Sequence, residues 1–110
     1  MKKRSYIEGT PEQKAKVLHF LGHTLACLRA MSFSYQTSHW QAQGATFYED
    51  HLLFERLYGS VTEEIDALAE KLVGYLGSDS VTLLNQAEKF LAYCSRWALV
   101  TDPYQRGLQA

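Results

Sequence analysis

The stretch SHWQAQGATFYEDHLLFERLYGSVTEEIDALAE, residues 38–70, decides the fold because it holds a helix end, a tight turn and most of a second helix. Only Gly44, Ala45, Thr46 and Phe47 connect two long segments that both carry apolar residues at helical spacing. Helices joined by so few residues must fold back on one another. The stretch therefore predicts an antiparallel helical hairpin.

The first helix of this hairpin is expected to begin after Thr10. Thr10 can cap the helix, Pro11 suits the first helical position, and Gln13 can complete a capping box. The helix can run to about Gln43 and end at Gly44. Its expected apolar stripe comprises Leu18, Leu21, Leu25, Leu28, Met31 and Tyr35.

The second helix is expected to begin between Tyr48 and Asp50 and to run to about Leu76, where Gly77 ends it. Its apolar stripe comprises Leu53, Phe54, Leu57, Val61, Ile65, Leu68, Leu72 and Leu76. A third, less regular helix is expected from Val81 to about Val100, before the Asp102-Pro103-Tyr104 break. Its apolar face is expected to use Leu84, Ala87, Leu91 and Cys94.

These elements predict an all-α fold, an antiparallel helix bundle within a single domain spanning residues 1–110. Two long helices and one shorter helix are too few to close a four-helix bundle. Either the chain associates with other copies to finish its core, or the sequence lacks C-terminal helices.

Composition limits the partners and the compartment. The formal charge of −1 gives no global attraction to nucleic acid or to an anionic membrane, and residues 1–4 form the only basic cluster. Cys27 and Cys94 lie far apart in apolar surroundings, so both are expected to be reduced thiols of a cytoplasmic protein. No apolar run approaches the length of a membrane span, so the protein is expected to be soluble.

Candidate metal ligands lie on one flank of the second helix. At about 100° per residue, His51, Glu55, Asp66 and Glu70 border the apolar stripe. Small residues lie between them on the same flank: Gly59, Thr62 and Ala69. His39 points inward from the first helix and can approach His51 across the tight turn. Two imidazoles brought together in this way can bind a divalent transition metal.

The carboxylates lie too far along the helix to complete this site. Asp66 and Glu70 are neighbours, and a bound cation would relieve the repulsion between them. Fifteen residues separate His51 from Asp66, which is about 22 Å on a helix. A two-fold axis between two copies would place the histidines of one chain opposite the carboxylates of the other. Mixed nitrogen and carboxylate ligation suits iron or another first-row metal.

Simpler interpretations exist for each residue alone. An inward histidine is more often a hydrogen-bonded core residue, and Asp66 and Glu70 could form a solvated acidic face balanced by Arg56 and Lys71. The four residues together favour the metal site, since one dimer geometry unites them. His19 and His23, also four apart, lie away from the apolar stripe; they could hold a metal on the surface, but a solvated face is expected.

At these residues the sequence resembles the Dps family, the ferritin-like proteins that protect DNA during starvation. The resemblance covers roughly residues 10–77. It depends on His39-Trp40, Gly44, Phe47, His51, Phe54-Glu55 and Asp66-Ala67-Leu68-Ala69-Glu70. All spacings between these residues match the family signature. Family members are usually longer and complete the bundle with two more long helices.

The resemblance implies a ferritin-like bundle assembled into a homo-oligomeric cage, commonly of 12 subunits. It implies oxidation of Fe(II), preferably by hydrogen peroxide, at a site shared across a two-fold interface, with iron storage inside the cage. By position, His39 and His51 would come from one subunit, and Asp66 and Glu70 from the other. Glu55 would be an accessory acid near a second metal position.

Two further implications concern Trp40 and DNA. Trp40 stands where the family places a tryptophan beside the site, so it would pack at the interface or accept an oxidising equivalent. Some members bind DNA through a lysine-rich tail, to which Lys2, Lys3 and Arg4 correspond weakly. The alternative function is a non-enzymatic helical assembly or nucleoid-binding module whose metal site is vestigial.

Overall fold

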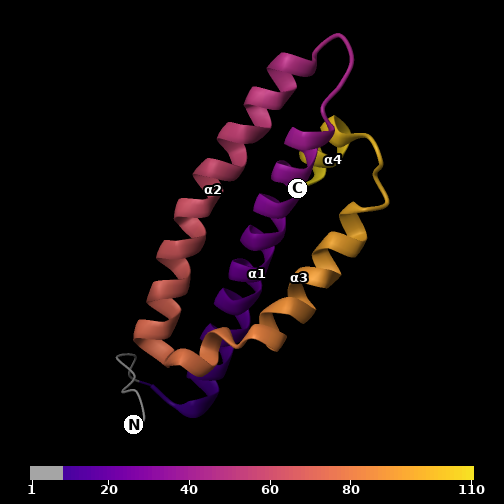
Figure 1. Ribbon diagram of the computed structural model, residues 1–110. Coiled ribbons are helices and arrows are strands. Elements are labelled where there is room, and N and C mark those ends of the chain that lie inside the picture. Colours follow the sequence, from indigo (N-terminus) through magenta and orange to yellow (C-terminus); the bar gives the residue numbers. More distant parts are fainter. Residues whose placement is uncertain (1–8) are drawn as a thin grey trace.

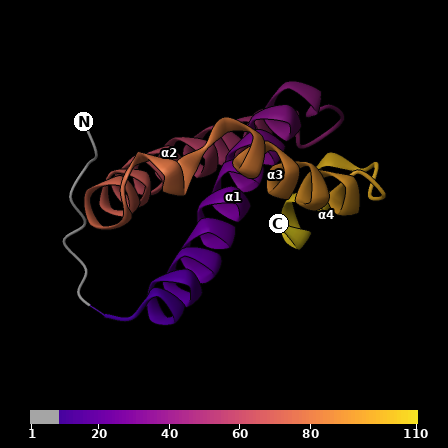
Figure 2. The ribbon, with the colours of Figure 1, turned by 90° about the horizontal axis from the view of Figure 1, so that it is seen from below.

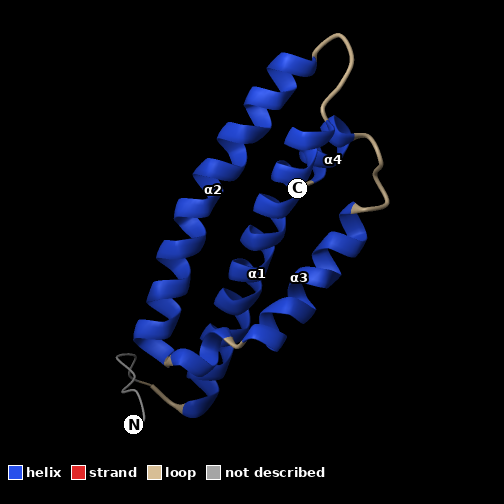
Figure 3. Ribbon diagram, viewed as in Figure 1, coloured by secondary structure: helices blue, strands red, loops and turns tan. Residues whose placement is uncertain are grey.

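The computed structural model describes residues 9–110, so the basic cluster at residues 1–4 lies outside the described part. These residues form helices and loops and contain no strand, which confirms the all-α prediction (Figure 3). The elements in chain order are α1 (Pro11–Gln41), α2 (Phe47–Leu76), the 3-10 turn η1 (Ser78–Val81), α3 (Leu83–Trp97) and α4 (Pro103–Gln109). Within this part of the chain, no helix is long and apolar enough to cross a bilayer.

Helix α1 is the centre of the fold. It pairs with α2 as an antiparallel hairpin, and α3 runs along its other side (Figure 1). Seen from below, α2 and α3 lie on different sides of α1 (Figure 2). Helix α4 packs beside the C-terminal half of α1, and η1 also contacts α1. The body is therefore elongated, with extents of 55 × 24 × 21 Å.

The ends of α1 follow the signals in the sequence. The Gln13 backbone N–H donates to Thr10 Oγ1 at 3.2 Å, and the Thr10 N–H donates to Gln13 Oε1 at 2.9 Å, which completes the expected capping box. The helix ends at Gln41, two residues earlier than expected. Gly44 has φ of 90°, a left-handed conformation that suits glycine and reverses the chain before α2.

The buried face of α1 differs from the expected leucine stripe. Its buried residues are Gly22, Leu25, Ala26, Ala30, Ser34, Tyr35, Ser38 and His39. Leu18 is exposed, and Leu21, Leu28 and Met31 are only half-buried. Small side chains four residues apart are fully covered because α1 has neighbours on both sides, whose larger side chains reach over them.

The expected apolar face of α3 was wrong. Leu84 and Leu91 are 70% and 64% exposed, whereas Gln86 and Trp97 are buried. The Gln86 amide donates to the Gly22 carbonyl at 3.1 Å, which fixes this face of α3 against α1. A buried donor without a partner would cost stability, so this bond favours the rotation of α3 that turns Gln86 inward, although Gln86 Oε1 has no hydrogen-bond partner there.

Helix α4 was not predicted as a helix, although the sequence carries its start signal. The Asp102 carboxylate accepts from the Gln105 N–H at 2.9 Å, and Pro103 occupies the first turn. Ser38 Oγ donates to the Pro103 carbonyl at 3.1 Å and accepts from Arg106 Nη2 at 2.9 Å. These bonds tie α4 to the last turn of α1.

Both cysteines are free and half-buried. Burial raises the pKa of the Cys27 thiol, and a hydrogen bond with Tyr93 partly opposes this effect. Burial also raises the pKa of Cys94. Both side chains are therefore protonated, weakly reactive thiols near neutral pH.

Alanine at Gly107 should destabilise the fold. A Cβ there would lie 2.5 Å from Cε1 of Phe54, whose ring is buried and cannot move aside freely. We expect Gly107→Ala to lower the free energy of unfolding by about 1–3 kcal/mol in urea denaturation followed by circular dichroism. Gly74→Ala is the matched control, since its Cβ meets nothing within 4 Å and should raise stability by about 0.5–1 kcal/mol. Native stability in Gly107→Ala would contradict the packing of α4 on Phe54.

The raised thiol pKa values predict slow alkylation. At pH 8 the folded chain should react with iodoacetamide more slowly than the urea-unfolded chain, because a raised pKa leaves less thiolate at a given pH. The rate for the folded chain should rise as the pH is increased toward these pKa values. Mass spectrometry of Cys27 and Cys94 peptides measures both rates, and equal rates in the two states would argue against burial of the thiols.

Candidate metal centre

His39 and His51 meet where α1 ends and α2 begins. His39 is only 9% exposed, and His51 is half-buried. His39 Nδ1 lies 2.7 Å from the His51 carbonyl oxygen, and His51 Nδ1 lies 3.0 Å from the His39 carbonyl oxygen. Each imidazole is therefore hydrogen-bonded to the backbone of the other histidine.

These two bonds fix the tautomer of both rings. A carbonyl oxygen can only accept a hydrogen bond, so Nδ1 carries the proton and donates in each ring. In a neutral imidazole, Nε2 then keeps its lone pair, which is the form that binds a metal. Protein carbonyls orient metal-binding histidines in this manner.

The bond from His51 also stabilises the end of α1. The last four carbonyls of a helix have no partner within it, and the His39 carbonyl is among these in α1. The His51 imidazole supplies the missing donor from the opposite helix. The histidine pair therefore has a structural role in addition to any ligand role.

Aromatic rings hold the pair in place. The His39 and His51 rings stack with centroids 3.7 Å apart and planes 23° apart. Phe47 stacks on the other face of the pair at 5.3 Å from His51, and Tyr58 approaches His39 edge-on at 5.5 Å. Sequence reasoning missed Tyr58, although it lies seven residues after His51 and hence on the same helix face.

Helix α4 supports this end of the hairpin. Ser38 precedes His39 and bonds to both Pro103 and Arg106. Arg106 also donates to Gln41 Oε1, and burial lowers its pKa, an effect that Asp102 opposes. The last turn of α1 is consequently held from both sides, by α4 and by the histidines of the hairpin.

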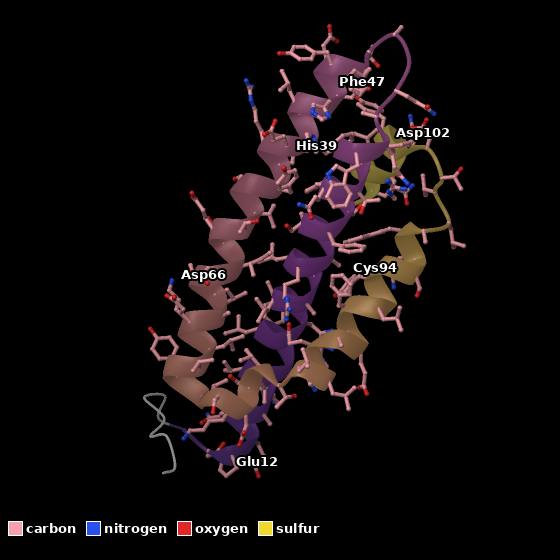
Figure 4. The ribbon with its side chains drawn as sticks, viewed as in Figure 1. Glu12, His39, Phe47, Asp66, Cys94 and Asp102 are labelled. Carbon is pink, nitrogen blue, oxygen red and sulfur yellow. The ribbon has the colours of Figure 1, made fainter. Side chains whose placement is uncertain are left out.

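The candidate carboxylates lie elsewhere. Glu55, Asp66 and Glu70 are exposed on α2, and Figure 4 shows Asp66 far along α2 from His39. Two carboxylates that border an apolar stripe are expected to be partly buried, and this expectation was wrong for the single chain, in which both are exposed. Among the described residues, no group of three or more histidine, cysteine or acidic side chains could hold a metal ion. Within one chain the histidine pair and the carboxylates thus lie apart, as two candidate half-sites.

Trp40 also faces solvent in the single chain. It follows His39 at the end of α1, and its side chain is 68% exposed. Large aromatic side chains are often buried when subunits associate. Its exposure next to the histidine pair is consistent with an interface there.

Comparison with known proteins finds several curated relatives of this chain. It is 35% identical over 74 residues to the Nutrient stress-induced DNA-binding protein of Synechococcus sp., a match that covers 67% of this chain and 42% of that protein. It is 33% identical over 64 residues to the DNA protection during starvation protein of Listeria innocua, covering 58% of this chain and 41% of that protein. The Listeria monocytogenes protein of the same name gives the same figures. No family model and no solved structure matches the chain.

The helical hairpin and these relatives define an all-α, ferritin-like bundle protein. The chain is a homologue of the Dps proteins, which confirms the resemblance seen in its sequence. It spans less than half the length of the curated relatives that it matches.

The two half-sites should differ in their effect on stability. His39→Ala removes a buried ring and a bond to the His51 carbonyl, so we expect the free energy of unfolding to fall by about 2–3 kcal/mol. Asp66→Asn and Glu70→Gln change exposed groups and should stay within about 0.5 kcal/mol of the native chain. Urea denaturation in chelator-treated buffer measures all three. A large loss in either carboxylate variant would show a structural role that a single chain does not explain.

Proposed function

We propose that this protein oxidises Fe(II), with hydrogen peroxide as the oxidant, at a site shared between two copies of the chain. The observation that carries the proposal is the His39 and His51 pair, in which both Nδ1 atoms are bonded to backbone carbonyls and both Nε2 atoms remain for a metal. The names of its relatives add DNA binding and the protection of DNA during starvation. The expected role is iron detoxification and storage, and protection from oxidative damage.

The site requires a second copy of the chain, because the candidate ligands of one chain lie too far apart. About 22 Å of helix separates His51 from Asp66, so the carboxylates of the same chain cannot reach the histidine pair. Across a two-fold axis, Asp66 and Glu70 of one copy would face His39 and His51 of the other, giving two equivalent sites. The small exposed residue Gly59 lies on this flank between the half-sites and would allow close approach.

The resemblance extends this proposal to larger assemblies. We propose that residues 1–110 act as one ferritin-like domain, that the dimer is the unit of the site, and that dimers assemble into a cage. Glu55 lies one turn after His51 on the exposed side of α2, where it would serve as the accessory acid. Reduced thiols at Cys27 and Cys94 are consistent with a cytoplasmic location.

The chemistry follows from the ligand set. Imidazole and carboxylate together suit Fe(II), the substrate, and the carboxylates also balance the charge of Fe(III). Two Fe(II) ions give up one electron each, and these electrons break the O–O bond of one peroxide, which takes up two protons and leaves as two waters. Hydrolysis of Fe(III) then releases protons and deposits mineral. Because peroxide is consumed in this two-electron step, less hydroxyl radical forms.

Association with DNA is the second candidate function. The names of the relatives favour it, since one is called a DNA-binding protein and another a DNA protection protein. The net charge of −1 gives no general attraction to a polyanion, so any contact would be local. Gel-shift assays at 50 and 200 mM salt with a variant of Lys2, Lys3 and Arg4 would test the basic cluster directly.

Ferroxidation should depend on both half-sites. Purified chain is loaded anaerobically with Fe(II), peroxide is added, and the ferric absorbance is followed. We expect His39→Ala and Asp66→Ala each to lower the initial rate at least about 10-fold. Glu64→Gln is the matched control, because Glu64 is an exposed acid on another face of α2 and its loss should leave the rate unchanged. Native rates in both half-site variants would refute the proposal.

Subunit mixing tests the shared geometry. A dimer of one His39→Ala chain and one Asp66→Ala chain has one intact site and one doubly altered site. Random exchange makes about half of the dimers mixed, so about a quarter of the native activity should return. Mass measurement confirms exchange, and no recovery after proven exchange would exclude a site built from two chains.

A further inference from the structure

The first half of α1 carries a second histidine pair, far from the first. His19 is exposed and His23 is half-buried, so the expectation of a fully solvated face was only partly correct. Their ring centroids lie 4.7 Å apart, with planes at 65°. Sixteen residues separate His23 from His39, which is about 24 Å along the helix. The pair is thus independent of the hairpin end.

The spacing of the two rings suits chelation of one metal ion. A metal–nitrogen bond of about 2.0–2.1 Å puts the ion about 3.2 Å from the centre of each imidazole. Two centroids 4.7 Å apart then subtend an angle of about 95° at the ion. This value lies between the octahedral and tetrahedral angles, so the separation of the two rings is compatible with both serving as ligands of one ion once their nitrogens turn toward it. Two histidines four apart on a helix bind zinc in metalloproteases by the same spacing.

The surroundings favour neutral imidazole and leave room for more ligands. Burial lowers the pKa of His23, and the nearby His19 and Lys89 lower it further. The pair borders a cavity of about 320 Å³ that is also lined by Cys27 and Tyr93. A water needs about 30 Å³, so several waters can complete the coordination of an ion there.

The charge of Lys89 opposes a cation at this place. Its ammonium group donates to Asn85 Oδ1 on the same helix. Lys89 is half-buried, so part of its charge is still screened by water, and the two-point chelate outweighs the remaining repulsion. Lys89 therefore weakens the site without closing it.

We propose that His19 and His23 form a second metal site, which binds a divalent first-row ion of the Cu²⁺ or Zn²⁺ class with water as the remaining ligands. Imidazole donors without carboxylates select these ions over Mg²⁺ and Ca²⁺, and Cu²⁺ binds more tightly than Zn²⁺ in the general order of affinities. The chelate exists only while this part of α1 is helical, so bound metal stabilises the N-terminal half of α1. The site does not depend on the proposed iron chemistry.

Calorimetric titration of the metal-stripped full chain with CuCl₂ at pH 7.5 tests the site. We expect His19→Ala and His23→Gln each to remove one Cu²⁺ per chain, or to weaken its binding at least about 10-fold. His39→Ala should retain this ion, because the hairpin pair is a separate site. Lys89→Gln should tighten binding about 2- to 5-fold by removing the opposing charge.

Two controls distinguish loss of the metal site from loss of the native fold. First, thermal unfolding without metal should show that His19→Ala and His23→Gln keep the native fold. His19 is exposed, so its loss leaves the core intact. Adding ZnCl₂ should raise the unfolding temperature of the native chain more than that of the two variants, which keep only the His39 and His51 pair. Native Cu²⁺ affinity and stoichiometry in both variants, or weaker binding in Lys89→Gln, would overturn the proposal.

Discussion

Two hydrogen bonds join the helices of the hairpin at the place where a metal would bind. His39 and His51 each donate to the backbone of the other, so the side chains that would hold iron also lock the end of α1 to the start of α2. With the two helix ends held together in this way, Phe47 stacks on His51 and Tyr58 contacts His39 edge-on. Ligand geometry and helix capping therefore depend on the same two imidazoles, which preorganises the rings before metal arrives.

The hairpin could be predicted because its signals are local. The Thr10 capping box, Gly44 and Gly77 fix the ends of two long helices, and the spacing of His39 and His51 across a short turn brings them together. The carboxylates show the limit of this reasoning. Their neighbouring positions follow from helix geometry, whereas both are exposed because nothing in the sequence pattern decides what covers that flank of a single chain.

Helices α3 and α4 could not be assigned correctly by periodicity. Helix α3 has apolar residues on both sides, so leucine spacing favoured the Leu84 and Leu91 face, whereas the Gln86 amide and Trp97 turned the opposite face inward. Seven residues are too short for α4 to show a helical period. The cap formed by Asp102 and Pro103 could have predicted the start of α4 from the sequence. The hydrogen bond from Ser38 to the Pro103 carbonyl could not, because it joins distant parts of the chain.

The central position of α1 has a consequence for the motions of this protein. Every other described element contacts α1, and α2 and α3 each depend on it for their burial (Figure 1). Opening of α1 would expose the whole interior at once, while α3 and α4 can detach singly. Amide protons in the middle of α1 should then exchange only through global unfolding, and those of α4 through a local event of lower free energy. The helix that carries both histidine pairs is therefore the last element of the molecule to unfold.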